Sequence, residues 1–175
     1  KTENMKKILI TLIVALAAVF AADAQKFALV DMDYILRNVP SYEMANTQLN
    51  QVSQRWEKEV NELAKESETL YKNYQSDMVF LSDDQKKARE KEIVDKENEI
   101  SQLRNKYFGP EGELYKKRQA LMKPIQEDVY NAVKAVAEEK GYQCVFDRAS
   151  SQSIVFASPR IDISNDVLAK LGYSK

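Results

Sequence analysis

The chain lacks the residues on which many enzymes depend. Its 175 residues include no histidine, which is the commonest general base and a frequent metal ligand. They include one cysteine, Cys144, so neither an intrachain disulfide nor a thiol-rich metal site can form, and we expect Cys144 to be a small buried side chain. No nucleophile motif is present. We therefore predict that the chain is not an enzyme and has no catalytic residue, metal site or cofactor.

Residues that form turns are also scarce. The chain has only four glycines and four prolines, whereas charged residues make up 30% of it. This composition favours long exposed helices over a compact fold rich in β-strands. The formal net charge of −1 gives no bulk positive field that would hold nucleic acid, and no nucleic-acid motif occurs. We therefore expect no nucleic-acid partner.

No apolar run reaches the roughly 20 residues that a membrane-spanning helix needs. The longest run, residues 8–20, has 13 residues interrupted only by Thr11 and follows the basic start Met5-Lys6-Lys7. Ala22-Asp23-Ala24 then fits the small-x-small pattern of a cleavage site, so residues 1–24 are predicted to be an N-terminal extension and signal peptide cleaved near Ala24. A membrane anchor is the alternative. Removal of residues 1–24 leaves 23 basic and 25 acidic residues, a net charge of −2.

The centre of the chain, residues 41–141, is predicted to be a long helical hairpin. Apolar residues recur at steps of three and four along its first leg, with one serine in the series. The positions are Leu49, Val52, Trp56, Val60, Leu63, Ser67, Leu70, Tyr74, Met78 and Leu81. A stripe one residue wide is typical of a coiled-coil seam. Ser41 is expected to cap this first helix.

Two interruptions divide the hairpin. At the tip, residues 80–84, Ser82 and Gln85 match a capping box, so a second helix is predicted to start there and to run antiparallel to the first. Its seam is thin: Ala88, Ile93, Ile100, Leu103 and Tyr107. The second interruption, Gly109-Pro110, cannot lie inside a regular helix, so a third helix is expected to follow and to stop at Gly141.

The segments that flank the hairpin are predicted to form a small β-rich body. Residues 25–40 contain a first strand, and residues 142–175 contain a strand pair followed by a short C-terminal helix. The pair is interpreted as a β-hairpin formed by residues 142–147 and 153–157. A body of roughly 45 residues is marginal as an independent core. The fold class is therefore α+β, and we expect several chains to pool their bodies; the pattern alone does not give the number of chains.

The order of these elements resembles the Skp/OmpH family of periplasmic chaperones. The resemblance covers the whole chain after the signal peptide. Its most family-like parts are the strand Tyr142-Gln143-Cys144-Val145-Phe146-Asp147 and the closing motif Asp162-Ile163-Ser164-Asn165-Asp166-Val167-Leu168. The resemblance implies a homotrimer in which a β-rich trimerisation body carries three coiled-coil arms around a cavity. It also implies a periplasmic location and ATP-independent binding of unfolded outer-membrane proteins.

Within that reading, exposed apolar residues of the hairpin are the candidate client contacts. They are Tyr71, Met78, Val79, Phe80, Leu81, Tyr107 and Phe108. The alternative for each is packing in the seam or at the tip, but four consecutive apolar residues at a hairpin tip cannot all face the seam. The candidate residues for oligomer contacts in the body are Phe27, Leu29, Val30, Val145, Phe146 and Val155.

Charge separates this chain from the best-known members of the family, which are strongly basic. The net charge of −2 after cleavage argues against a site for anionic lipopolysaccharide built on basic arm residues, and the sequence leaves lipid contact open. A second hypothesis for the function is a structural coiled-coil protein of the envelope, a spacer or adaptor without chaperone activity.

Overall fold

The computed structural model describes residues 26–151 and 153–173, so the predicted signal peptide and its cleavage site lie outside the described residues. The chain divides into two compact units. Residues 36–130 form one, here called the helical unit. Residues 26–35 together with 131–173 belong to the other, here called the strand unit. Among the described residues, no helix is both long and apolar enough to cross a membrane.

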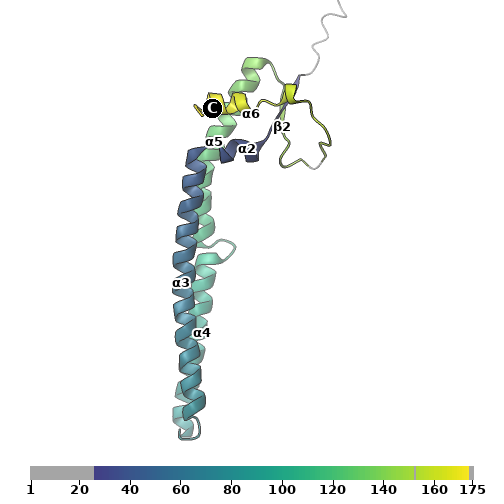
Figure 1. Ribbon diagram of the computed structural model, residues 1–175. Helices are drawn as coiled ribbons and strands as arrows, with labels where there is room; N and C mark the ends of the chain where they lie inside the picture. The colour runs from purple at the N-terminus through teal and green to yellow at the C-terminus, as the bar shows by residue number, and fades with distance from the viewer. Residues whose placement is uncertain (1–25, 152, 174–175) are drawn as a thin grey trace, which may run out of the picture. The chain divides into compact units, whose positions relative to one another are not determined.

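Two long helices of the helical unit lie side by side and form the predicted hairpin (Figure 1). Helix α3 runs over Pro40–Asp77, and α4 runs over Asp83–Phe108. With 38 residues, α3 is about 57 Å long at the usual helical rise. Five residues, 78–82, connect the two helices, and so short a connection forces them to run antiparallel.

The seam of α3 follows the predicted positions. Leu49, Val60 and Ser67 are buried, and the remaining positions are half-buried, with one exception. The exception is Met78, which is exposed because α3 has ended before it. On α4 the seam is shorter than predicted, because Ala88 is exposed and Ile93 is the first buried apolar residue.

The helix ends show which local signals decided the structure. The capping box at the start of α4 is confirmed: the Gln85 amide donates to Ser82 Oγ at 3.4 Å, and the Ser82 amide donates to Gln85 Oε1 at 2.9 Å. The predicted cap at Ser41 is wrong. Helix α3 begins one residue earlier with Pro40 in its first turn, where a missing N–H costs nothing, and its N-cap residue Val39 makes no side-chain cap bond.

The interruption after α4 is confirmed and is enforced by close backbone contacts. A Cβ added at Gly109 would lie 2.4 Å from the Asn105 carbonyl oxygen, and one added at Gly112 would lie 2.8 Å from the Tyr107 oxygen. Helix α5 then runs over Glu113–Lys140 and continues through Pro124. Gly141 follows with φ of 72°, a left-handed conformation that stops the helix at low cost.

The strand unit contains two strands, β1 (Phe27–Val30) and β2 (Cys144–Asp147), which pair in parallel with Phe27 opposite Cys144. The short helix α2 (Met32–Arg37) follows β1. The one-turn helix η1 (Pro159–Ile161) and helix α6 (Ser164–Lys170) close the chain. A bridge joins Leu29 to Asp162 on the other side of β1, so β1 is the central segment of the sheet.

The predicted β-hairpin of residues 142–147 and 153–157 is wrong. The described residues of 151–158 form no strand, and the partner of β2 is β1 instead. Strand β1 is apolar on both faces and buries Ala28, Leu29 and Val30, so pairing with it removes more apolar surface from water than a local hairpin would. Cys144 is exposed rather than buried, because it lies at the start of an edge strand.

The core of the strand unit is formed by several elements. Buried apolar residues come from β1, from α2, from the last turns of α5 and from the C-terminal segment that contains α6. They are Ala28, Leu29, Val30, Ile35, Ala132, Val136, Ile163, Val167 and Leu168. The predicted C-terminal helix is present: α6 starts at Ser164, with Ile163 as its N-cap residue, and packs through Val167 and Leu168.

Candidate functional site

The tip of the hairpin presents apolar side chains to solvent. Phe80 is 86% exposed, Val79 is 77% exposed and Met78 is 43% exposed, whereas Leu81 is half-buried. The local sequence explains this exposure, because α3 ends at Asp77 and the capping box fixes the start of α4 at Asp83. The connecting residues are too few for all of them to turn back onto the seam. Exposed apolar groups of this size are able to contact a partner.

Two of the other candidate contacts lie apart from the tip and differ in exposure. Tyr71 on α3 is 50% exposed, and its hydroxyl accepts a hydrogen bond of 2.9 Å from the Gln75 side chain. Phe108, the last residue of α4, is half-buried. The structure therefore does not gather all the predicted contacts into one patch.

Tyr107 is buried in an aromatic cluster. Its ring stacks on Trp56 with centroids 4.6 Å apart and planes 5° apart, and Phe108 meets both rings edge to face. The Tyr107 hydroxyl donates to the carboxylate of Glu59 at 3.0 and 3.2 Å. Desolvation, together with this hydrogen bond, raises the pKa of Tyr107. The cluster ties α3 to the end of α4 just before the glycine break, so we assign Tyr107 to packing.

The candidate assembly residues of the strand unit fall into two groups. Leu29 and Val30 are buried within the chain, and Val145 is half-buried. Phe27, Phe146 and Val155 are 54%, 50% and 98% exposed. The second group lies on an open apolar surface.

That surface is hollowed. Phe27 and Phe146 meet edge to face at 6.4 Å, and together with Ile154, Val155 and Phe156 they line a cleft of about 540 Å³. Phe156 is 85% exposed. We call this the apolar cleft of the strand unit. An apolar cleft lined by residues of both strands is a surface against which another chain can pack.

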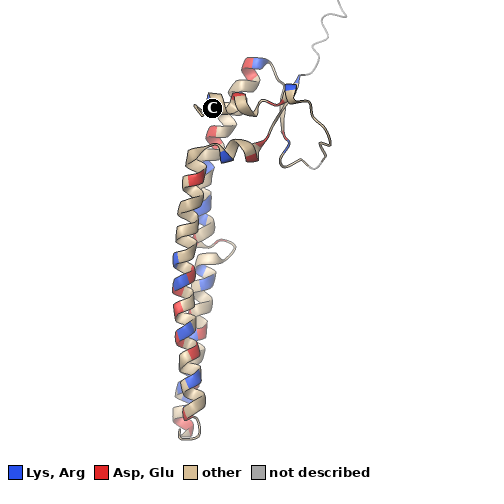
Figure 2. Cartoon of the chain, viewed as in Figure 1, with Lys and Arg blue, Asp and Glu red and all other residues tan. Residues whose placement is uncertain are grey.

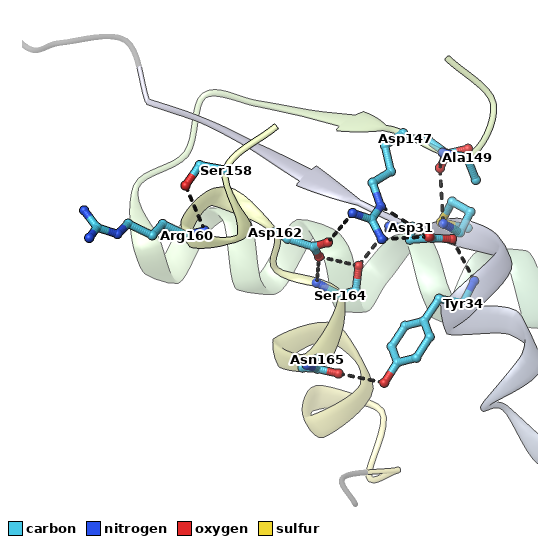
Figure 3. Close-up of polar contacts among 11 residues, drawn as sticks. Asp31, Tyr34, Asp147, Ala149, Ser158, Arg160, Asp162, Ser164 and Asn165 are labelled. Carbon is cyan, nitrogen blue, oxygen red and sulfur yellow. Dashed lines mark hydrogen bonds and ion pairs between the residues drawn. The ribbon is translucent and has the colours of Figure 1, made fainter. Parts of the chain in front are cut away.

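A polar network joins the ends of both strands to the start of α6 (Figure 3). The guanidinium of Arg148 lies 3.1 Å from Asp31 Oδ2 and 3.3 Å from Asp162 Oδ2. Ser164 Oγ accepts a hydrogen bond from the Asp31 amide at 2.8 Å and donates one to Asp162 Oδ1 at 2.6 Å. The Tyr34 hydroxyl donates to Asn165 Oδ1 at 3.0 Å. The network fixes three segments that are far apart in the sequence.

Hydrogen bonds set the acidity of two carboxylates at the strand ends. The pKa of Asp31 is lowered, first by a hydrogen bond from the Tyr34 amide, against some desolvation, and then by Arg148. Burial raises the pKa of Asp147, but bonds from Ser150 and from the Met32 amide outweigh it, so this pKa is also lowered. Both groups therefore remain ionised at neutral pH and act as fixed acceptors.

Sequence reasoning missed two of these features. It placed Trp56 in the seam but did not pair it with Tyr107, because the register of two antiparallel helices does not follow from either stripe alone. It also assigned no role to Arg148, although Arg148 joins two carboxylates. The signal for that role was present in the acidic residues Asp31 and Asp162, one at the end of a strand and one ahead of a helix.

Charges on the hairpin are of both signs and interspersed, as Figure 2 shows for α3 and α4. Most pairs are exposed contacts within one helix, such as Lys72 with Glu68 at 2.6 Å and Lys91 with Asp95 at 2.7 Å. Exposed pairs of this kind contribute little to stability. These exposed pairs therefore do not explain what holds the two helices together.

Comparison with known proteins agrees with this architecture. A crystal structure of an OmpH-like protein from Caulobacter crescentus CB15 superposes with a TM-score of 0.68 at 12% identity and covers 86% of each chain, which shows a common fold. An uncharacterized protein of Aquifex aeolicus (strain VF5) is 31% identical over 169 residues, which are 95% of this chain and 96% of that protein. A protein of Yersinia enterocolitica named Chaperone protein Skp is 27% identical over 161 residues, 90% of this chain and 92% of that one.

The family comparison covers nearly all the described residues. The model of the family described as "Outer membrane protein (OmpH-like)" matches residues 26–171, from β1 through the end of α6. The chain belongs to this OmpH-like family, the Skp/OmpH family of chaperones.

Proposed function

We propose that the chain is an ATP-independent periplasmic holdase. In this proposal a homotrimer encloses a cavity between its helical arms, binds unfolded outer-membrane proteins there and prevents their aggregation. Family membership supports the class of activity, and one relative is named as a chaperone. The observation that carries the proposal is the exposed apolar tip, with Val79 77% and Phe80 86% exposed.

A holdase needs apolar contacts that are weak, numerous and adaptable. Met78, Val79 and Phe80 provide such contacts at the tip, and Tyr71 and Phe108 are further candidates along the hairpin. Methionine and aromatic side chains adapt to varied partners because methionine is flexible and aromatic rings offer large faces. No bond is made or broken in this activity, which agrees with the absence of histidine and of any nucleophile motif.

The apolar cleft of the strand unit supports assembly with further copies of this chain. Val155 and Phe156 are almost fully exposed, which is unfavourable for a single chain in water. Strand β2 has a free edge, and the residues of 153–157 are free to form a strand once a second chain supplies a partner. Three strand units joined in this way would place three hairpins around one axis.

The decisive experiment is an aggregation assay. An unfolded β-barrel outer-membrane protein is diluted from denaturant, and light scattering is followed with and without an equimolar amount of the trimer. The holdase proposal expects suppression of scattering without ATP. If an intact trimer leaves the scattering unchanged, the structural coiled-coil hypothesis takes its place.

A variant at the hairpin tip tests whether its exposed apolar side chains bind the client. We expect Val79→Ser combined with Phe80→Ser to weaken suppression and to leave the mass of the oligomer unchanged, because both side chains are exposed. The matched control is Val94→Ser combined with Tyr130→Ser, which removes apolar side chains that are 52% and 67% exposed elsewhere. Equal loss in both variants would show that the tip has no special role.

A further inference from the structure

A groove between α3 and α4 lies away from the tip and has no role in the account above. Its volume is about 470 Å³. Leu63 of α3 and Leu103 of α4, both half-buried seam residues, form its apolar part. It lies at the stretch of seam between the buried residues Val60 and Ser67. We call it the hairpin groove.

Carboxylates dominate the sides of the hairpin groove. Glu59, Glu62 and Glu66 come from α3 and Glu99 comes from α4, whereas Lys106 is the one cationic residue that lines it. Among the residues that line the groove, four carboxylates therefore stand against one cation. A groove with an apolar base and acidic sides is complementary to a segment that carries both apolar and basic side chains.

Three of these carboxylates already have lysine partners. Lys96 lies 3.5 Å from Glu66 and 3.0 Å from Glu99, and Lys58 lies 3.7 Å from Glu62. The side chains of these three glutamates are 61%, 56% and 62% exposed, whereas that of Lys96 is 25% exposed. Water screens the exposed Lys58–Glu62 pair, and a cation that reaches Glu66 or Glu99 shares them with Lys96.

Glu59 closes one end of the hairpin groove and is held differently. The buried Tyr107 donates its hydroxyl proton to this carboxylate, so the charge of Glu59 is fixed in place without being neutralised. A hydrogen bond from a neutral donor leaves the negative charge available to a cation. Glu59 is therefore a preorganised anchor for a basic group.

We propose that the hairpin groove binds lysine- and arginine-bearing apolar segments of unfolded clients. The aliphatic stem of a basic side chain would lie over Leu63 and Leu103, and its charged head would reach the glutamates. Segments rich in Asp or Glu would be repelled. This inference rests on the proposed holdase function and adds a charge preference to it.

Trp56 provides a direct readout of occupancy. It is the only tryptophan of the chain, and it stacks on Tyr107, which holds Glu59 at the end of the hairpin groove. A peptide of alternating Leu and Lys and a peptide of the same length with alternating Leu and Glu, both without tryptophan, are titrated into the full chain. We expect a saturable change in Trp56 fluorescence with the Lys peptide that weakens as salt is added, and little change with the Glu peptide.

Paired variants localise the effect. Replacing Glu62→Gln together with Glu99→Gln should raise the dissociation constant of the Lys peptide by about threefold to tenfold, since each exposed pair contributes modestly. The matched control, Glu57→Gln with Glu97→Gln, removes two exposed carboxylates that do not line the groove and should leave the constant unchanged. Equal effects of the two pairs, or equal binding of both peptides, would overturn the inference.

The aggregation assay separates this inference from the proposed function. If the unsubstituted chain protects an unfolded β-barrel protein and yet binds both peptides equally, the charge preference is wrong and the holdase function stands. If it protects nothing, the holdase function is wrong as well. Both proposals are supported only if the chain protects the unfolded β-barrel protein and also binds the Lys peptide in preference to the Glu peptide.

Discussion

Arg148 offers the sharpest test of how the strand unit is held together. Its guanidinium lies between Asp31, at the end of β1, and Asp162, ahead of α6 (Figure 3). Arg148→Met keeps an unbranched side chain of similar length and removes the charge. The prediction is that this variant loosens the strand unit and leaves the helical unit unaffected.

The magnitude follows from the exposure of the partners. Both carboxylate side chains are 21% exposed, whereas Arg148 is 45% exposed, so solvent screens each ion pair in part. Each of the two ion pairs stabilises the strand unit by about 0.5–1 kcal/mol. In the Arg148→Met variant, the two carboxylates also lose the cation that lies between them. We expect Arg148→Met to destabilise the strand unit by about 1–2 kcal/mol.

Native-state hydrogen exchange followed by mass spectrometry measures this locally. A loss of 1–2 kcal/mol corresponds to exchange about 5- to 30-fold faster in peptides from β1, β2 and α6. Peptides from α3 and α4 should exchange as before. The matched control is Arg160→Met, because Figure 3 shows the Arg160 side chain pointing away from the network and only its backbone amide takes part, donating to Ser158 Oγ.

The pH dependence of the stability loss provides a second test of the role of Arg148. The folded-state pKa of Asp31 lies below its ordinary value, so the stability it contributes is present above the unfolded pKa and is lost as the pH falls through the folded one. The effect of Arg148→Met should therefore shrink below about pH 4. If Arg148→Met and Arg160→Met behave alike at neutral pH, the bridge does not hold the strand unit together.

Three further predictions concern other parts of the chain. Val155→Asp should lower the mass of the oligomer in light scattering, because the side chain is 98% exposed in the single chain and the proposed assembly would bury it against another copy; an unchanged mass would remove the apolar cleft from the proposed interface. Tyr107→Phe should cost about 0.5–1.5 kcal/mol in urea unfolding followed by tryptophan fluorescence, since the bond to Glu59 is lost while the ring stack remains. Gly141→Ala should lower the melting temperature, because φ of 72° costs an alanine about 1–2 kcal/mol; no change would mean that the helix end rearranges.

The helical unit was predictable because its signals are local. The stripe from Leu49 to Leu81, the capping box at Ser82 and the break at Gly109 are local signals; the capping box and the break were confirmed, and the stripe holds except at the exposed Met78. The error at Ser41 has the same local origin: two competing helix starts lie side by side, and Pro40 prevails because its fixed φ already suits the first turn.

The strand unit was harder because its pairing is not local. Strand β2 pairs with β1 across more than a hundred residues of helix, whereas sequence reasoning chose the nearest apolar segment, residues 153–157. Apolar patterning suggests strands but does not give their partners, and turn signals carry no information about a parallel connection of this length. The network around Arg148 is a consequence of the same pairing and was missed with it.

The two kinds of exposed apolar residue now call for different explanations. At the tip, exposure follows from local geometry, because five residues between two capped helices have nowhere to pack, so Phe80 stays exposed in any assembly that leaves the tip free. In the strand unit, Val155 and Phe156 line the apolar cleft and are 98% and 85% exposed, and we attribute this exposure to the absence of the proposed partner chain. We therefore propose that the exposed apolar surface of the strand unit serves assembly and that the exposed surface at the hairpin tip serves client binding.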